Sequence, residues 1–78
     1  MKPENNKELR KLVKDGILNC KGEDLICGFD IDIDGSIVDA GNIDARDINA
    51  WDINAKDIKA WDINAGDIKA YAIVTGKQ

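Results

Sequence analysis

A five-residue repeat fills the second half of the chain. From residue 43 the sequence reads IDARD, INAWD, INAKD, IKAWD, INAGD and IKAYA, so each unit begins with Ile and has Ala two places later. The frame extends backwards through IDGSI and VDAGN at 33–42 and forwards to IVTGK at 73–77, which makes nine units. Such self-similarity is typical of solenoids, in which each repeat buries its apolar face against its neighbours.

The period of five excludes an α-helix for this region. Residues five apart on a helix differ by about 140° in direction, so the isoleucines would spiral around it. In a strand, residues i and i+2 share a face, so each Ile-x-Ala step directs both side chains inward and the next two residues turn the chain. A disordered tract would lack β-branched residues at regular positions. The repeat therefore predicts a mainly β fold wound as a solenoid.

The repeat resembles that of the pentapeptide-repeat proteins over residues 33–77, more than half of the chain. This resemblance implies a right-handed, quadrilateral β-helix of stacked repeats, with about twenty residues in each coil. One departure is the order of the inward pair, because the family usually places the small residue before the large one and this chain places Ile before Ala. A coil of twenty residues would stack Ile43 on Ile63 and Asp47 on Asp67.

Residues 1–16 are expected to cap the solenoid with a helix. Residues 4–15 have a helical pattern that ends at Gly16, a stop signal. Asn5 or Asn6 is the expected N-cap, because a side-chain oxygen there can accept from a backbone N–H of the first turn. The apolar face of the helix consists of Leu9, Leu12 and Val13.

Residues 17–32 are expected to form a degenerate first coil and a lead-in strand. Leu18-Asn19-Cys20 matches the Ile-x-Ala step in frame. Strict alternation then predicts one longer strand, with its apolar side chains at Leu25, Cys27, Phe29, Ile31 and Ile33. The pentapeptide-repeat β-helix follows at residues 33–78, and the whole chain is expected to be a single domain.

The C-terminal end of the repeat carries apolar residues without an evident cap. Residues 70–74 read AYAIV before the short tail TGKQ. A terminal coil exposes unpaired backbone groups and apolar atoms, so self-association as a homodimer is expected through Tyr71, Ile73 and Val74. The alternative is a small overhang shielded by Lys77 and Gln78.

Three aromatic residues fall at every second unit, always after Ala: Trp51, Trp61 and Tyr71. In a four-sided coil, Trp51 and Tyr71 would share one face and Trp61 would lie on the opposite face. Exposed aromatic side chains on a polar surface often mark an interface with a partner. The alternative is that they shield neighbouring strands and stiffen the corners.

Charge is divided unevenly along the chain, whose net charge is −4. Residues 1–16 contain five basic and three acidic side chains, whereas residues 17–78 contain six basic and twelve acidic ones. An acidic body argues against direct nucleic-acid binding. The chain has no apolar run near the ~20 residues of a membrane span and no signal peptide, so a cytoplasmic protein is expected, without membrane contact.

The residue types that most enzymes and metal sites use are few. Histidine is absent and no Ser, Cys or Lys has an adjacent base, so no enzymatic activity and no cofactor are predicted. Cys20 and Cys27 lack the further ligands of a zinc site and are expected to be buried thiols. The segment DIDIDG at 30–35 resembles the start of a calcium loop, but the twelfth position is Gly41, where a bidentate Glu is needed. No metal site is predicted.

The acidic residues that recur in the repeat support the main functional prediction. Some members of the family that the chain resembles match B-form DNA in shape and charge, and they occupy DNA-binding grooves on enzymes such as DNA gyrase. The resemblance implies a non-enzymatic DNA mimic that blocks such an enzyme or a host defence complex of the CRISPR type. A small Lys/Ile/Asn-rich repeat protein also resembles a phage or mobile-element product. The residues expected to stand in for phosphates are Asp44, Asp47, Asp52, Asp57, Asp62 and Asp67.

Other interpretations of the same features stay open at this point. Acidic outward residues keep any solenoid soluble and prevent its edges from aggregating, whether or not they bind a protein partner. The main alternative function is a structural module that self-associates end to end through its terminal coil. Binding of a small ligand between protomers has no motif that supports it.

Overall fold

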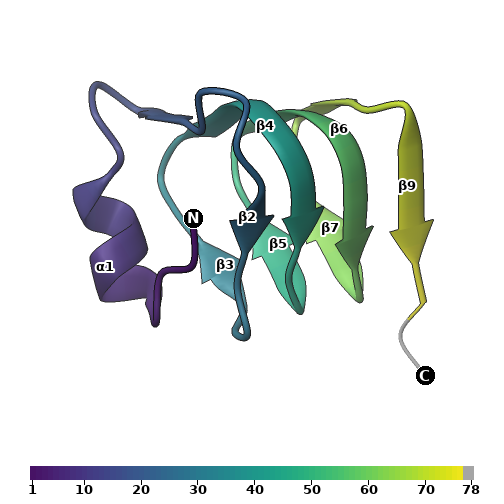
Figure 1. Ribbon diagram of the computed structural model, residues 1–78, viewed down its shortest axis with the longest axis horizontal. Helices are drawn as coiled ribbons and strands as arrows, with labels where there is room; N and C mark the ends of the chain where they lie inside the picture. The colour runs from purple at the N-terminus through teal and green to yellow at the C-terminus, as the bar shows by residue number, and fades with distance from the viewer. Residues whose placement is uncertain (77–78) are drawn as a thin grey trace.

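The computed structural model describes residues 1–76, which form one short helix followed by a series of short strands (Figure 1). The elements in chain order are α1 (Asn6–Lys11), β1 (Ile17–Asn19), β2 (Leu25–Ile26), β3 (Ile31–Asp32), β4 (Ser36–Asp44), β5 (Asp47–Asn49), β6 (Asp52–Ala60), β7 (Asp62–Asn64), β8 (Asp67–Lys69) and β9 (Ala72–Thr75). The fold is therefore mainly β, as predicted. No helix in residues 1–76 has the length and hydropathy needed to span a bilayer.

The strands wind into a parallel β-solenoid of about four coils, which lie side by side along its long axis (Figure 1). Each full coil has three sides. The first side holds β1, the start of β4, the start of β6, and β8; the second holds β2, the end of β4, the end of β6, and β9; the third holds β3, β5 and β7. The nine-residue strands β4 and β6 thus bend from the first side to the second.

The register between coils is fifteen residues in the regular part of the solenoid. Ile43 pairs with Ile58, Ile48 with Ile63, and Ile53 with Ile68. One coil therefore contains three pentapeptides, and the twenty-residue, quadrilateral coil implied by the family resemblance is wrong for this chain. The physical reason is that any whole number of pentapeptides returns Ile to an inward position. The period of five alone leaves the number of sides undetermined.

The N-terminal coils are longer than the regular ones. Ile17 pairs with Ser36, nineteen residues later, and Ile31 pairs with Ile48, seventeen residues later. The register shifts again within β4, where Asp39 has a positive φ of 52°. Such a shift is a bulge, in which one strand carries an additional residue.

The core is a column of Ile and Ala side chains inside the coils, which confirms the inward positions predicted from the repeat except at Val38, which is only half-buried while its neighbour Ile37 is fully buried. Each fully buried Ile contributes roughly 1.5–3 kcal/mol relative to an exposed one. The small alanines let the chain turn tightly around this narrow interior. The buried repeat residues are Ile33, Ile37, Ala40, Ile43, Ala45, Ile48, Ala50, Ile53, Ala55, Ile58 and Ala60.

Helix α1 covers the N-terminal end of the core, although it is shorter than predicted. Its N-cap is Asn5, whose side-chain oxygen accepts from the backbone N–H of Glu8 at 3.0 Å, as predicted. The helix ends at Lys11, because Lys14 leaves the helical path and forms an antiparallel bridge with Ile17. Leu9 is fully buried, whereas the predicted core contact of Leu12 is wrong, since this side chain is 43% exposed.

The lead-in segment before the repeat keeps its predicted inward positions but not its predicted length. Leu18 and Cys20 are buried, in agreement with the degenerate first coil. The single strand expected between Leu25 and Ile33 is instead divided into β2 and β3. β2 and β3 lie on different sides of the coil, so the chain turns a corner between them.

Candidate functional site

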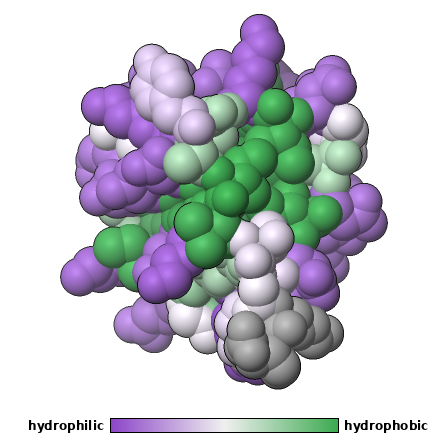
Figure 2. Space-filling view, turned by 90° about the vertical axis from the view of Figure 1, so that its right-hand side faces the viewer, coloured by the Kyte–Doolittle hydropathy of each residue, from purple (hydrophilic) through white to green (hydrophobic). Residues whose placement is uncertain are grey.

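The C-terminal end of the solenoid is an open apolar surface. Ile68 and Ile73 occupy inward positions in the last coil, yet they are 36% and 46% exposed. The residues that they stack on, Ile53 and Ile58, are 2% and 1% exposed. Figure 2 shows this end facing the viewer, with a band of apolar surface across its centre and polar residues around it.

Two of the residues predicted for self-association lie beside this surface. Val74 lies on β9, and its side chain is 60% exposed. Tyr71 immediately precedes β9, and its side chain is 90% exposed. The outermost strands at this end are β7, β8 and β9, one on each side of the coil. Among residues 1–76, no further strand pairs with their outer edges. Such edges present backbone donors and acceptors to any strand that approaches them.

The N-terminal end is closed on its third side by side chains of α1. The amide of Asn6 donates from Nδ2 to the backbone oxygen of Asp30 at 2.8 Å and accepts at Oδ1 from the backbone N–H of Asp32 at 3.0 Å. The guanidinium of Arg10 donates to the backbone oxygen of Asp32 at 3.0 and 3.2 Å. The Asn6 amide thus takes the place of a neighbouring peptide group on the outer edge of β3.

The other two sides of the N-terminal end are closed by backbone groups. Lys14 exchanges two hydrogen bonds with Ile17 on β1, at 2.8 and 2.9 Å. The backbone oxygen of Met1 accepts from Ile26 on β2 at 3.0 Å, and the Met1 ammonium donates to the backbone oxygen of Asp24 at 2.8 Å. All three edge strands at this end are therefore occupied. A helical cap in residues 1–16 was predicted from the sequence, but these contacts with the strand edges were not.

Several corner aspartates hydrogen-bond to the coil above them. Asp52 accepts at Oδ1 from the backbone N–H of Asp67 at 3.1 Å, and Asp30 accepts from Asp47 in the same way at 3.1 Å. Asp24 accepts from the N–H of Asn42 at 2.8 Å. These carboxylates satisfy backbone donors at the turns, a role that Asp favours.

The predicted acidic ladder is divided among the sides of the coil. Asp47 stacks with Asp62 and Asp52 stacks with Asp67, so the predicted contact between Asp47 and Asp67 is wrong. Asp57 pairs with Asn42 in the preceding coil and with Ala72 in the following coil. Asp44 pairs with Lys59. One carboxylate oxygen, Oδ1 of Asp47, is buried without a hydrogen-bond partner in the described part of the chain.

The three aromatic side chains lie at three different corners, so the predicted sharing of a face by Trp51 and Tyr71 is wrong. Each aromatic residue donates its backbone N–H to a different residue of the preceding coil: Trp51 to Gly35, Trp61 to Arg46 and Tyr71 to Lys56. The three residues therefore stack over three different positions of the coil. Arg46 Cζ lies 4.5 Å from the centroid of the Trp61 ring, a cation–π contact. The ring of Trp51 covers Gly16, so a Cβ added there would be 3.1 Å from the indole.

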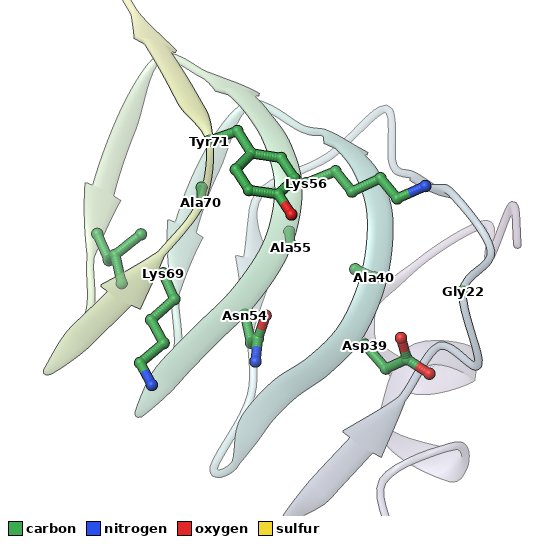
Figure 3. Close-up of a pocket in the computed structure, with 10 residues that line it drawn as sticks. Gly22, Asp39, Ala40, Asn54, Ala55, Lys56, Lys69, Ala70 and Tyr71 are labelled. Atoms are coloured by element: carbon green, nitrogen blue, oxygen red, sulfur yellow. The ribbon is translucent and has the colours of Figure 1, made fainter.

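A shallow groove of about 440 Å³ crosses the outside of the solenoid over Ala40, Ala55 and Ala70 (Figure 3). Small-molecule sites place a few polar groups so that they converge on the ligand. In Figure 3 the side chain of Lys56 extends to the right and that of Lys69 extends downward, so their ammonium groups lie far apart in the view. The groove therefore lacks the converging groups of such a site.

The cysteines and the aspartates of the DIDIDG segment have structural surroundings. Cys20 and Cys27 are buried free thiols, and burial raises the pKa of both, that of Cys27 to about 11. The carboxylate of Asp32 lies 3.7 Å from the guanidinium of Arg10, and Asp30 serves the turn described above. In residues 1–76 no group of three or more Cys, Asp or Glu side chains is placed to hold a metal ion.

Comparison of the chain with protein-family models, with curated proteins and with solved structures found no match in any of the three. The class of the protein is therefore defined by its own structure. It is a parallel β-solenoid of about four coils with a short N-terminal helix, and its repeat is compatible with a pentapeptide-repeat β-helix.

Proposed function

We propose that the protein is a non-enzymatic assembly module that binds a second copy of itself through its C-terminal end. The observation that carries this proposal is the exposure of Ile68 and Ile73, whose equivalents one coil earlier are buried. Removal of apolar surface from water contributes about 25 cal/mol per Å². Covering the end with another protein surface is therefore favourable.

A second copy presents a surface that fits this end. The outer strands β7, β8 and β9 run around three sides, so a partner must offer three strands in the same arrangement to pair with all of them. A two-fold axis across the solenoid would turn each strand of one copy antiparallel to the strand that it meets. The same end of a second copy thus supplies matching donors, acceptors and apolar side chains.

The size of the end sets the expected affinity. The molecule measures 31 × 21 × 21 Å, so the end is no wider than 21 Å in either direction. Standard protein interfaces remove about 800 Å² of surface from each partner, which is more than this end supplies. We expect a dissociation constant in the micromolar range rather than the nanomolar range.

Sedimentation equilibrium across the micromolar range tests the proposal. The wild-type mass should rise with concentration from 8.6 kDa towards twice that value. Ile73→Asp should stay at 8.6 kDa, because an uncompensated charge at the interface opposes association. Ile26→Asp is the matched control, since Ile26 is similarly exposed, at 41%, but lies on β2 at the closed end. A wild-type protein that stays at the mass of one chain would refute the proposal.

DNA mimicry stays a second prediction, and the regular spacing of the aspartates favours it. Stacked coils lie about 4.8 Å apart, and residues 47–61 contain three Asp and two Lys, a net charge of −1. B-form DNA carries one charge per about 1.7 Å, so the net charge density here is about one third of that value. This difference makes self-association the better-supported function.

Gyrase supercoiling assays at low and high salt test the mimicry. Inhibition by the wild-type protein that weakens with salt, and that is lost when Asp47, Asp57 and Asp67 are changed to Asn, is the expected result of mimicry. Equal inhibition by that variant, or no inhibition by either protein, would count against mimicry of DNA at this enzyme.

We further propose that the solenoid is a right-handed member of the pentapeptide-repeat class and that it resides in the cytoplasm. Connections between parallel strands of a sheet are right-handed in nearly all proteins, and the Ile-x-Ala step recurs on each side. The two buried thiols, Cys20 and Cys27, suit a reducing compartment.

A further inference from the structure

We infer that residues 1–16 limit assembly to two copies, because they occupy the end of the solenoid that would otherwise receive the C-terminal coil of another copy. This inference rests on the proposed self-association, and it adds that head-to-tail assemblies of more than two copies are excluded. A solenoid with two open ends can add copies head to tail without limit, which gives a filament. A solenoid with one open end can only close as a pair.

The N-terminal end is hydrogen-bonded on each of its three sides. Each of the three strands there has an outer-edge partner: Lys14 for β1, Met1 for β2 and Asn6 for β3. Leu9 fills the centre and is fully buried. An incoming coil could pair with one of these strands only after the residue on the outer edge of that strand is displaced.

Charge alone would not prevent head-to-tail growth. Residues 1–16 carry a net charge of +2, whereas residues 62–76 contain two Asp and one Lys, a net charge of −1. Opposite ends therefore attract one another and like ends repel. The occupied strand edges at the N-terminal end must therefore prevent head-to-tail growth. Salt should strengthen the dimer, because it screens the repulsion between the two C-terminal ends.

The block on the third side depends on few side chains, which makes it testable. Within residues 1–76, the hydrogen bonds from α1 to the edge of β3 come from Asn6 and Arg10. Both side chains lie on the helix, at positions that leave the buried Leu9 and the Asn5 cap in place. Changing both should free this edge while the repeat keeps its own pairing.

The test compares an Asn6→Ala, Arg10→Ala variant with a Lys7→Ala, Lys11→Ala control. The control removes two charges from the same helix at exposed positions. We expect the first variant to form assemblies larger than a dimer, whose mass rises continuously with concentration in sedimentation velocity. The control should stop at the dimer. Adding Ile73→Asp to the first variant should abolish the large assemblies, because growth needs the open C-terminal end.

Two outcomes separate this inference from the proposed function. If the wild type is a monomer but the Asn6, Arg10 variant forms long assemblies, the proposed dimer is wrong and the blocking role stands. If the variant retains its β circular dichroism and still stops at a dimer, the blocking role is wrong and the proposed dimer stands. Should the double variant fail to fold, Asn6→Ala alone gives a weaker form of the same readout, because it removes both hydrogen bonds of Asn6 to the edge of β3 and leaves Arg10 in place.

Discussion

Arg46 lies directly beneath Trp61, one coil earlier, with its guanidinium carbon 4.5 Å from the centre of the indole ring. The N–H of Trp61 donates to the backbone oxygen of Arg46, so the two residues also meet through their main chains. Fifteen residues separate them in the sequence. The same separation places Tyr71 over Lys56. Two corners of the solenoid thus carry an aromatic residue above a cation.

The contact between Arg46 and Trp61 should be measurable as a coupling energy. A double-mutant cycle with Arg46→Ala and Trp61→Ala should give about 0.5–1 kcal/mol, the usual range for an exposed cation–π pair. Urea unfolding of the four proteins supplies the free energies. A cycle on Trp51 and Tyr71 is the control, because the two lie at different corners, and it should give a coupling near zero. The reverse order of the two couplings would contradict the fifteen-residue register.

The hydrogen bond from Asp67 to Asp52 should stabilise the turn between coils. Asp52→Ala removes the acceptor of the Asp67 N–H, which should lower the free energy of unfolding by about 1 kcal/mol. Asp52→Asn keeps an acceptor oxygen and removes the repulsion between two stacked carboxylates, so its stability should equal or exceed that of the wild type. Urea unfolding at low and high salt checks both variants. An Asn variant as unstable as the Ala variant would show that the charge, rather than the acceptor, matters.

The corner at Gly66 should not accept a side chain. A Cβ there would lie 2.9 Å from the backbone oxygen of Trp51 and 3.0 Å from Oδ1 of Asp52. Gly66→Ala should therefore cost about 1–3 kcal/mol, the usual range for overpacking. Gly28→Ala is the matched control, because nothing lies within 4 Å of its added Cβ. Thermal unfolding should show a lower melting temperature for the first variant only, and equal shifts would contradict the close approach of these coils.

Burial of Cys27 should make stability fall in alkaline solution. Its thiol pKa is raised from an ordinary value of 9.0 to about 11, chiefly by desolvation. Between these pH values the unfolded chain has lost the proton and the folded chain retains it, so the unfolded state binds fewer protons. The stabilisation is complete below pH 9 and is lost as the pH rises towards 11.

The alkaline loss should amount to about 2 kcal/mol and can be measured by urea unfolding at pH 8 and pH 11. Cys27→Ala is the control, because it removes the thiol, and Ala is already the residue at the equivalent inward position, Ala45, one coil later. The pH dependence of this variant should be weaker by that amount. An identical pH dependence in both proteins would show that the thiol is not the group responsible.

The inward positions could be predicted from the sequence because strand geometry leaves no other choice. Once Ile48 and Ile58 are taken to face the core, the alternation of a strand places Ala50 and Ala60 inside as well, and all four are buried. The number of units in a coil could not be obtained in the same way, since coils of fifteen and twenty residues keep the same frame. The available signal was a cation fifteen residues before an aromatic residue, which occurs twice within the repeat.

The closed N-terminal end could not be predicted, because it depends on contacts that are remote in the sequence. Asn6 meets Asp30 and Asp32 across 24 and 26 residues, and only the placement of α1 brings them together. The helix itself was predicted, with Asn5 or Asn6 as its N-cap, but its end was not. The chain forms an antiparallel bridge between Lys14 and Ile17 there in place of a further helical turn.

The three-unit coil has a consequence for how such a gene can evolve. Tandem duplication of a whole coil returns every residue to its own column, so it preserves pairs such as Arg46 and Trp61. Duplication of a single unit leaves every Ile facing the core but rotates all later outward residues by one side. Short duplications therefore let natural selection reassort the outer surface of this fold while the hydrophobic interior stays unchanged.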